Sequence, residues 1–369
     1  MRLSVEIPND LVAVSNGRFL GKTDLGDGFT RWDWQISYPI NNYCVSLNIG
    51  HYVHFTDQVQ GMTLDFYCLP ENLEKAKAQF VQAKSMIQAF QKYFGKYPFP
   101  KDGYKLVEAP YSGMEHQSAV TYGNRFANGY LERDWTGVGI SPRFDFIIIH
   151  ESGHEWFGNS VTAADVCDEW IHEGWGTYAE AVYVEHLFGT SDALKYINGY
   201  RSKVRNREPI ITPCGVNRTP PQDMYFKGAL FLNTLRSVVD DDARWWKMVR
   251  GFYDRFKYRT IATSDVVAFF NKETGKNLTP IFDQYLRHTD IPTLELAFES
   301  SDGTVSYRWK ADEPAFAMPV KIGKAGAWRV IRPTTGWQTI TAGLGRDECE
   351  VATDLYYVNV SRHLPGPES

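Results

Sequence analysis

The sequence has no apolar run of the roughly 18 to 20 residues that a membrane span needs. It also has no run of lysine and arginine, and its net charge is −5. We therefore expect neither a nucleic acid nor an anionic membrane as a partner. The N-terminal segment, Met1 to Asp10, lacks the apolar region of a signal peptide. No internal repeat and no low-complexity segment is present.

Cysteine is scarce, and its spacing is uninformative. The five cysteines are odd in number, lie far apart and form no C-x-x-C pair; they are Cys44, Cys68, Cys167, Cys214 and Cys349. This pattern predicts buried thiols and not a disulfide framework. Buried thiols favour a reducing compartment, which for this chain indicates the cytoplasm.

The remaining composition is that of a globular protein. Apolar residues make up 43% and charged residues 22% of the 369 residues, enough for two or three domains with their own cores. Aromatic residues make up 15%. Such residues recur in peptide-binding clefts, but we interpret most of them as core packing.

Hydrophobic periodicity divides the chain into three domains and predicts an α+β multidomain fold. Residues 1–68 read as strands, for instance where apolar residues alternate over 43–49. Residues 69–290 are mostly helical, and residues 291–369 carry short alternating segments typical of a small β-sandwich. Turns are predicted at three dipeptides, Asn16-Gly17, Asp27-Gly28 and Asp302-Gly303. An amphipathic helix is predicted from about Leu73 to Gly95.

The most informative segment is His150-Glu151-Ser152-Gly153-His154, which follows an apolar run. On a helix, residues four apart share a face, so His150 and His154 can chelate one zinc ion while Glu151 serves as a general base. Gly153 within this helix costs about 1 kcal/mol relative to alanine, which predicts a closely packed neighbour.

A catalytic zinc ion usually has three protein ligands and one open position. The segment Trp170-Ile-His172-Glu173-Gly offers the third ligand, and 18 residues separate Glu173 from His154. We favour Glu173. His172 remains the rival ligand, although as the adjacent residue it faces a different direction on a helix.

Four segments in a fixed order resemble the gluzincin aminopeptidase N and leukotriene hydrolase family. They are the zinc segment with its Trp-x-x-Glu-Gly partner, Ser112-Gly113-Met114-Glu115-His116, Tyr225-Phe-Lys-Gly-Ala, and Phe282-Asp-Gln-Tyr-Leu. The resemblance implies a thermolysin-like catalytic domain in the middle of the chain. It also implies one zinc ion per chain, held by His150, His154 and Glu173, with peptides that have a free N-terminus as substrates.

The same resemblance implies further roles. Glu151 is the general base, and Tyr225 donates a hydrogen bond to the oxyanion. Gly113, Met114, Glu115 and His116 form the substrate-binding segment, in which Glu115 binds the α-amino group. Two positions depart from the family pattern, because Ser112 replaces a glycine and His116 replaces an asparagine.

The family pattern also implies that about half of the N-terminal β-domain and the C-terminal helical domain are missing from this sequence. The expected function is zinc-dependent removal of single residues from peptide N-termini. Two alternatives stay open: a thermolysin-like endopeptidase, which Glu115 argues against, and a zinc-binding but inactive peptide-binding fragment.

Overall fold

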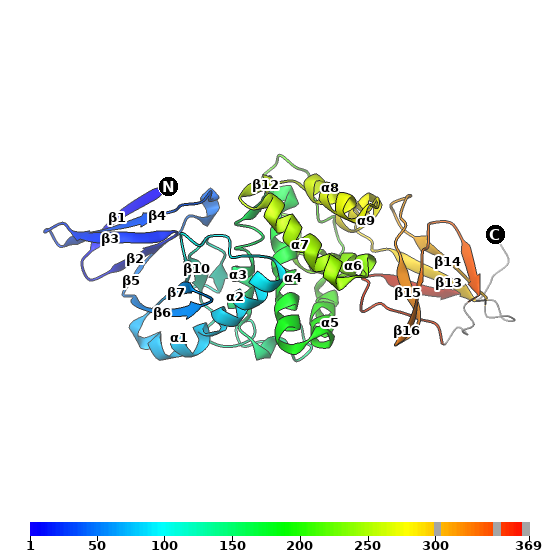
Figure 1. Cartoon of the computed structure of the whole chain (residues 1–369), viewed down its shortest axis with the longest axis horizontal. Helices are drawn as coiled ribbons and strands as arrows, with labels where there is room; N and C mark the ends of the chain where they lie inside the picture. The colour runs from blue at the N-terminus through cyan, green and yellow to red at the C-terminus, as the bar shows by residue number, and fades with distance from the viewer. Residues whose placement is uncertain (299–303, 342–347, 364–369) are drawn as a thin grey trace. The chain divides into compact units, whose positions relative to one another are not determined.

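The chain mixes helices and sheets, as the sequence predicts (Figure 1). The structure, a computed structural model, describes residues 1–298, 304–341 and 348–363. The chain forms two units: Met1–Ala163 with Ile171–Gly199 and Val249–Ile261, and Ala164–Trp170 with Tyr200–Met248 and Ala262–Ser369. Within the described residues, no helix is both long enough and apolar enough to cross a membrane. The three predicted domains, with boundaries after residues 68 and 290, stay a prediction.

The first unit contains three sheets built from the N-terminal half of the chain and a short parallel pair. Its strands are β1 (Arg2–Pro8), β2 (Val12–Ser15), β3 (Arg18–Asp24), β4 (Phe29–Gln35), β5 (Leu47–Gly50), β6 (Val53–Val59), β7 (Met62–Cys68), β8 (Tyr104–Glu108), β9 (Gly113–Met114), β10 (Val120–Tyr122), β11 (Val161–Ala163) and β12 (Arg259–Ile261). The strand orders are β1-β4-β3, β2-β5, β6-β7-β8-β10-β9 and β11-β12. Strand β9 is therefore an edge strand.

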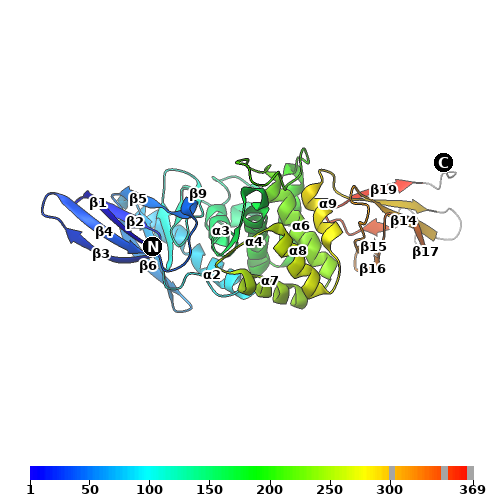
Figure 2. The same cartoon turned by 90° about the horizontal axis from the view of Figure 1, so that it is seen from above.

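Helices pack on the five-stranded sheet, and one of them, α3, carries the segment that begins with His150 and Glu151. The helices of this unit are η1 (Asn42–Cys44), η2 (Pro70–Asn72), α1 (Leu73–Phe80), α2 (Gln82–Tyr93), η3 (Ser141–Arg143), α3 (Phe146–Gly153), α4 (Trp170–Phe188, of which Trp170 belongs to the second unit) and α5 (Thr190–Gly199). Helix α3 contacts α2, β10 and β9, and Figure 2 labels α3 with α2 and β9. All residues of α3 are buried, because its sequence is apolar on every side except at the motif.

The second unit joins helices to two sheets. Its helices are η4 (Val166–Asp168), η5 (Tyr200–Lys203), α6 (Asp223–Val239), α7 (Asp242–Phe256, shared with the first unit), α8 (Thr263–Thr274) and α9 (Thr279–Arg287). Its strands are β13 (Thr293–Phe298), β14 (Thr304–Lys310), β15 (Val320–Lys324), β16 (Ala327–Ile331), β17 (Gln338–Thr341), β18 (Glu350–Val351) and β19 (Asn359–His363). The strand orders are β17-β14-β13-β19 and β16-β15-β18. Every second side chain of β13 and β14 is buried, which confirms the period-two pattern.

The predicted turns have different outcomes. Asp27-Gly28 joins the antiparallel strands β3 and β4, so that prediction is confirmed. The prediction of a hairpin at Asn16-Gly17 is wrong, because the flanking strands do not pair with each other: β2 pairs with β5, and β3 pairs with β4. Gly17 instead passes close to another strand: a Cβ there would lie 2.2 Å from the carbonyl oxygen of Gln35. The turn predicted at Asp302-Gly303 lies outside the described residues.

Two predicted elements differ in detail. The helix from Leu73 to Gly95 is two helices, α1 and α2, separated at Val81. The alternating segment 43–49 begins as the 3₁₀ helix η1 and becomes strand β5 only at Leu47. Its apolar side chains, of which Leu47 is 45% exposed, do not enter a core. Alternation predicts a strand but does not predict which neighbour covers it.

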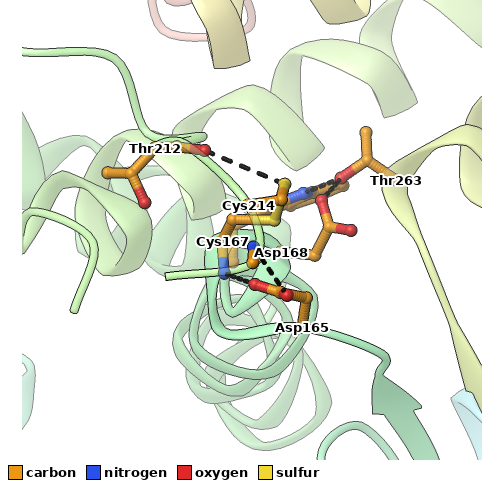
Figure 3. The surroundings of a disulfide bond; sticks show 8 residues. Asp165, Cys167, Asp168, Thr212, Cys214 and Thr263 are labelled. Carbon is orange, nitrogen blue, oxygen red and sulfur yellow. Dashed lines mark hydrogen bonds between the residues drawn. A yellow bond between two sulfur atoms is a disulfide. The ribbon is translucent and has the colours of Figure 1, made fainter. Parts of the chain in front are cut away.

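The prediction of five free thiols is wrong for two of them. Cys167 and Cys214 form a disulfide, with Cα atoms 5.1 Å apart (Figure 3), whereas the other three cysteines are free and buried. The side chain of Asp165 holds the two segments together, accepting hydrogen bonds from the backbone N–H groups of Cys167 and Gly215, both at 3.0 Å. The disulfide joins two cysteines that are 47 positions apart, so no local spacing in the sequence reveals it. The cysteine argument for a reducing compartment is thereby lost.

Candidate active site

Helix α3 is fixed at its first residue by a buried aspartate. Asp145 is the N-cap residue, and its side chain accepts hydrogen bonds from the backbone N–H groups of Ile147 and Ile148. It also accepts hydrogen bonds from the Tyr122 hydroxyl and from Gln79 Nε2, both at 2.6 Å. The start of the helix, and therefore the direction of the side chains one and two turns later, is set by this cluster.

Gly153 has the close neighbour that its presence in a helix predicts. A Cβ at this position would lie 3.1 Å from the Cβ of Ala179 on α4 and 3.8 Å from the Phe90 ring on α2. On α4, Gly176 has the same effect, because a Cβ there would lie 2.6 Å from His154 Cε1. The two glycines allow α3 and α4 to approach each other at the motif.

The approach of α3 and α4 brings three predicted ligands together. The Nε2 atoms of His150 and His154 are 3.4 Å apart. Glu173 Oε2 lies 3.6 Å from the first of these nitrogens and 3.3 Å from the second. All three side chains are buried, and their ligand atoms lie within 4.8 Å of one another, a spacing that could hold a metal ion.

Hydrogen bonds behind the histidines determine which nitrogens face the centre. His154 Nδ1 lies 3.0 Å from the carbonyl oxygen of Phe157, which can only accept, so Nδ1 carries the proton. His150 Nδ1 lies 2.7 Å from the carboxylate of Glu180. Glu180 in turn accepts a hydrogen bond from the Tyr196 hydroxyl at 2.6 Å. Such outer contacts orient metal-binding imidazoles and raise their basicity.

The three groups suit a zinc ion chemically. Glu173 Oε2 is buried and accepts no hydrogen bond from any described residue, although it faces two ring nitrogens. Burial disfavours the charged form of His154, but the carboxylates of Glu173 and Glu115 together outweigh burial and raise the pKa of His154 to about 9. A cation bound here would replace that proton. Two imidazoles and one carboxylate form a ligand set that zinc accepts in catalytic sites.

Two further carboxylates share this centre. The ligand atoms of Glu115, Glu151 and His154 also lie within 4.8 Å of one another, and both glutamates are buried. Burial, with the neighbouring Glu115 carboxylate, raises the pKa of Glu151 to about 7. A carboxyl group with a pKa near neutrality can both take and return a proton.

The predicted substrate-binding segment lies beside Glu151. Gly113 and Met114 form β9, which pairs antiparallel with β10. A Cβ on Gly113 would lie 2.6 Å from Ile147 and 3.0 Å from Glu151 Cγ, so only glycine allows this edge strand so close to α3. His116 is partly buried, and burial lowers its pKa; its Nδ1 lies 3.4 Å from the Thr121 hydroxyl.

His172, the rival ligand, is engaged elsewhere. Its Nε2 accepts a hydrogen bond from the backbone N–H of Ala163 at 2.8 Å. Burial, with the nearby His154, lowers its pKa to about 4, so the ring is neutral at physiological pH. The structure places Glu173, and not His172, with the two histidines.

Tyr225 belongs to the other unit. It lies in the first turn of α6, and its assignment to the site rests on the sequence pattern alone. Asp223 in the same turn accepts hydrogen bonds from the backbone N–H groups of Arg205 and Asn206. A third group of potential metal ligands, formed by Asp165 with Cys167 and Cys214, is occupied by the disulfide.

Sequence reasoning missed several residues that support the centre. Glu180 could have been found, because it lies seven residues after Glu173 and therefore on the same face of a helix. Asn159 and Tyr43 could not, because they reach the site through contacts distant in sequence: Asn159 Nδ2 donates to the backbone oxygen of Glu115 at 2.7 Å.

The comparisons with known proteins show the family of the chain. Residues 79–285 match the model of the peptidase family M1 domain, so the chain belongs to peptidase family M1. It is 24% identical over 314 residues to probable aminopeptidase 2 of Sulfurisphaera tokodaii, covering 81% of this chain and 39% of that protein. It is also 24% identical over 314 residues to human glutamyl aminopeptidase, covering 80% of this chain and 32% of the relative. The chain therefore spans less than half the length of these relatives.

Solved structures resemble the fold. Aminopeptidase A of Legionella pneumophila, in complex with aspartic acid, is similar over 98% of this chain and 44% of its own, with a TM-score of 0.79 and 16% identity. A mutant M1 zinc metallopeptidase from Deinococcus radiodurans, bound to a Tyr-Ser-Ala substrate, is similar over 79% of this chain and 64% of its own. That match has a TM-score of 0.61 and 20% identity.

Proposed function

We propose that the chain is the zinc-bearing part of an aminopeptidase that hydrolyses the first peptide bond of peptides with a free N-terminus. The observation that carries the proposal is the buried group of His150, His154 and Glu173, with the carboxylates of Glu151 and Glu115 at the same centre. Membership of peptidase family M1 supports peptide substrates and zinc as the metal.

The residues would divide the chemistry among them. His150, His154 and Glu173 would hold one zinc ion, which lowers the pKa of a water molecule and polarises the substrate carbonyl. Glu151 would accept the proton of the attacking water on its carboxylate and deliver it to the leaving amine. A carboxyl group with a pKa of about 7 suits both transfers.

Further residues would position the substrate and stabilise the oxyanion. Glu115 would bind the protonated α-amino group, which fixes the cleavage site one residue from the N-terminus. Edge strand β9, with Gly113 and Met114, would lie along the substrate, and His116 would adjoin the amine-binding carboxylate. Tyr225 would donate a hydrogen bond to the oxyanion of the tetrahedral intermediate.

The proposed architecture has an N-terminal β-domain over residues 1–68 and a thermolysin-like zinc domain over residues 69–290. A small β-sandwich over residues 291–369 would follow. The sheet orders of the C-terminal segment support the sandwich. The β6 and β7 strands pair into the same sheet as β8, so the first two domains would share a sheet.

The general-base role is tested by Glu151→Gln. We expect this variant to retain one zinc ion per chain and to lose hydrolysis of an aminoacyl amide by at least roughly 100-fold. Retained activity in a fully zinc-loaded variant would rule out Glu151 as the base. Loss of zinc as well would show that Glu151 supports the metal instead.

A further inference from the structure

One tyrosine outside all the recognised segments reaches the candidate amine-binding carboxylate. Tyr43 lies in the 3₁₀ helix η1 and is 42% exposed. Its hydroxyl oxygen nevertheless lies 3.3 Å from Glu115 Oε1 and 3.5 Å from His172 Nδ1. The phenol ring thus spans from solvent to the carboxylate.

The direction of the hydrogen bonds follows from the outermost partner. His172 Nε2 accepts a hydrogen bond from the backbone N–H of Ala163, so the ring proton resides on Nδ1. Nδ1 then donates to the Tyr43 oxygen, and the Tyr43 hydroxyl donates to Glu115. Burial, with the adjacent Glu115 carboxylate, raises the pKa of Tyr43 above its usual range, so the hydroxyl keeps its proton.

Buried amide side chains hold η1 beside the segment that carries Glu115. Asn16 Nδ2 donates to the backbone oxygens of Cys44 and Gln117, at 2.9 and 2.7 Å. On the other side, Asn159 accepts a hydrogen bond from the Cys44 thiol at 2.9 Å and donates to the backbone oxygen of Glu115 at 2.7 Å. These bonds fix the backbone next to Tyr43 and the backbone of Glu115 relative to each other.

We propose that Tyr43 is a positioning residue for the Glu115 carboxylate. Its hydroxyl holds Oε1 in one orientation and leaves the other oxygen for the ammonium group of the substrate. The residue therefore sets the affinity for a free amine without contacting the scissile bond. This inference rests on the proposed function, since it deepens the role given there to Glu115.

The test is a binding measurement in a protein that does not turn over. Zinc-loaded Glu151→Gln protein, with and without Tyr43→Phe, is titrated calorimetrically with leucylglycine and with N-acetyl-leucylglycine. We expect Tyr43→Phe to raise the Kd of leucylglycine about three- to tenfold, which is the effect of losing one ordinary hydrogen bond. The Kd of the acetylated peptide and the zinc content stay unchanged.

The matched control is Tyr38→Phe in the same background. Tyr38 lies in the same unit, and its hydroxyl accepts a hydrogen bond from the backbone N–H of Lys101. This control should leave both Kd values within twofold. An equal change for both peptides in Tyr43→Phe, or no change for either, would overturn the positioning role.

The parent protein separates this inference from the proposed function. If the Glu151→Gln protein binds the two peptides equally well, Glu115 does not select the amine, and both proposals fail. If it prefers the free amine and Tyr43→Phe keeps that preference, only the inference about Tyr43 fails.

Discussion

At the scale of single residues, the proposed metal site depends on side chains that would not touch the metal. Glu180 orients His150 through Nδ1, and the Phe157 carbonyl orients His154 in the same way. The sequence motif predicts the ligands, but these outer partners decide which ring nitrogen faces the proposed metal. These outer partners therefore contribute to the affinity for a metal ion.

Glu180→Gln tests this dependence. The amide keeps the size of the side chain but removes the charge beside His150, so we expect zinc to bind roughly 10- to 100-fold more weakly. Competition with a chromogenic chelator gives the Kd. Glu185→Gln, twelve residues beyond Glu173 on the same helix, should leave the Kd unchanged. Equal affinity in the wild type and Glu180→Gln would show that the outer carboxylate is dispensable.

A buried lysine makes stability depend on pH. Lys105 Nζ donates to the backbone oxygens of Gly17 and Asp102, and burial lowers its pKa to about 8. Between about pH 8 and the unfolded pKa of about 10.4, the unfolded chain binds more protons than the folded one. The free energy of unfolding contributed by this group therefore rises with pH over that window.

Urea unfolding of the wild type and Lys105→Met at pH 8 and pH 10 measures this contribution. We expect the wild type to gain roughly 2 kcal/mol relative to the variant between the two pH values. The comparison cancels the titration of tyrosines and other lysines. Parallel pH profiles of the two proteins would mean that Lys105 keeps an ordinary pKa when folded.

At the scale of elements, helix α3, which carries His150, is held by its N-cap cluster. Asp145 is fully buried and accepts hydrogen bonds from backbone and side-chain donors, including Asn124 Nδ2 at 2.9 Å. Asp145→Ala would leave these donors without an acceptor, so we expect a loss of about 2 to 4 kcal/mol in unfolding free energy. Urea unfolding measures the loss.

A second aspartate provides the control. Asp134 also accepts hydrogen bonds from two backbone N–H groups, those of Gly137 and Gly139, but at the surface. Asp134→Ala should cost less than about 1 kcal/mol, since water can replace the carboxylate. Similar losses in both variants would contradict the role of burial.

The elements also show how far sequence reasoning reaches. The motif helix, the alternating strands of the C-terminal segment and the turn at Asp27-Gly28 are encoded by local periodicity and turn chemistry, and they were predicted. Asn16-Gly17 has the same turn chemistry, yet it connects strands of two sheets. Asn16 is instead used to bind backbone groups of Ser46, Cys44 and Gln117. Contacts between distant segments overrule a local preference, and one sequence does not contain them in readable form.

At the scale of the whole molecule, the disulfide ties the segment before α4 to the loop before α6 within the second unit. The sequence did not predict this disulfide, because a contact between distant segments brings the two cysteines together. Asp165 and the folding of the chain set the pairing, and the spacing of the cysteines does not. It closes a loop of 47 residues, and a disulfide of that kind contributes about 2 to 4 kcal/mol.

Reduction should therefore lower the Tm of the wild type by about 5 to 15 °C. Calorimetry with and without a phosphine reductant measures the shift. The Cys167→Ser/Cys214→Ser variant should melt at the lower temperature in both conditions. A reductant effect in this variant, or none in the wild type, would contradict a stabilising disulfide.

The central claim is that the buried histidines and carboxylates form an aminopeptidase site, and one comparison of substrates tests it directly. Zinc-loaded protein is offered two aminoacyl amides that differ only in a free or an N-acetylated amine. The account predicts hydrolysis of the free-amine substrate alone, abolished by a chelator. Cleavage of both substrates, or of neither with one zinc ion bound per chain, would contradict it.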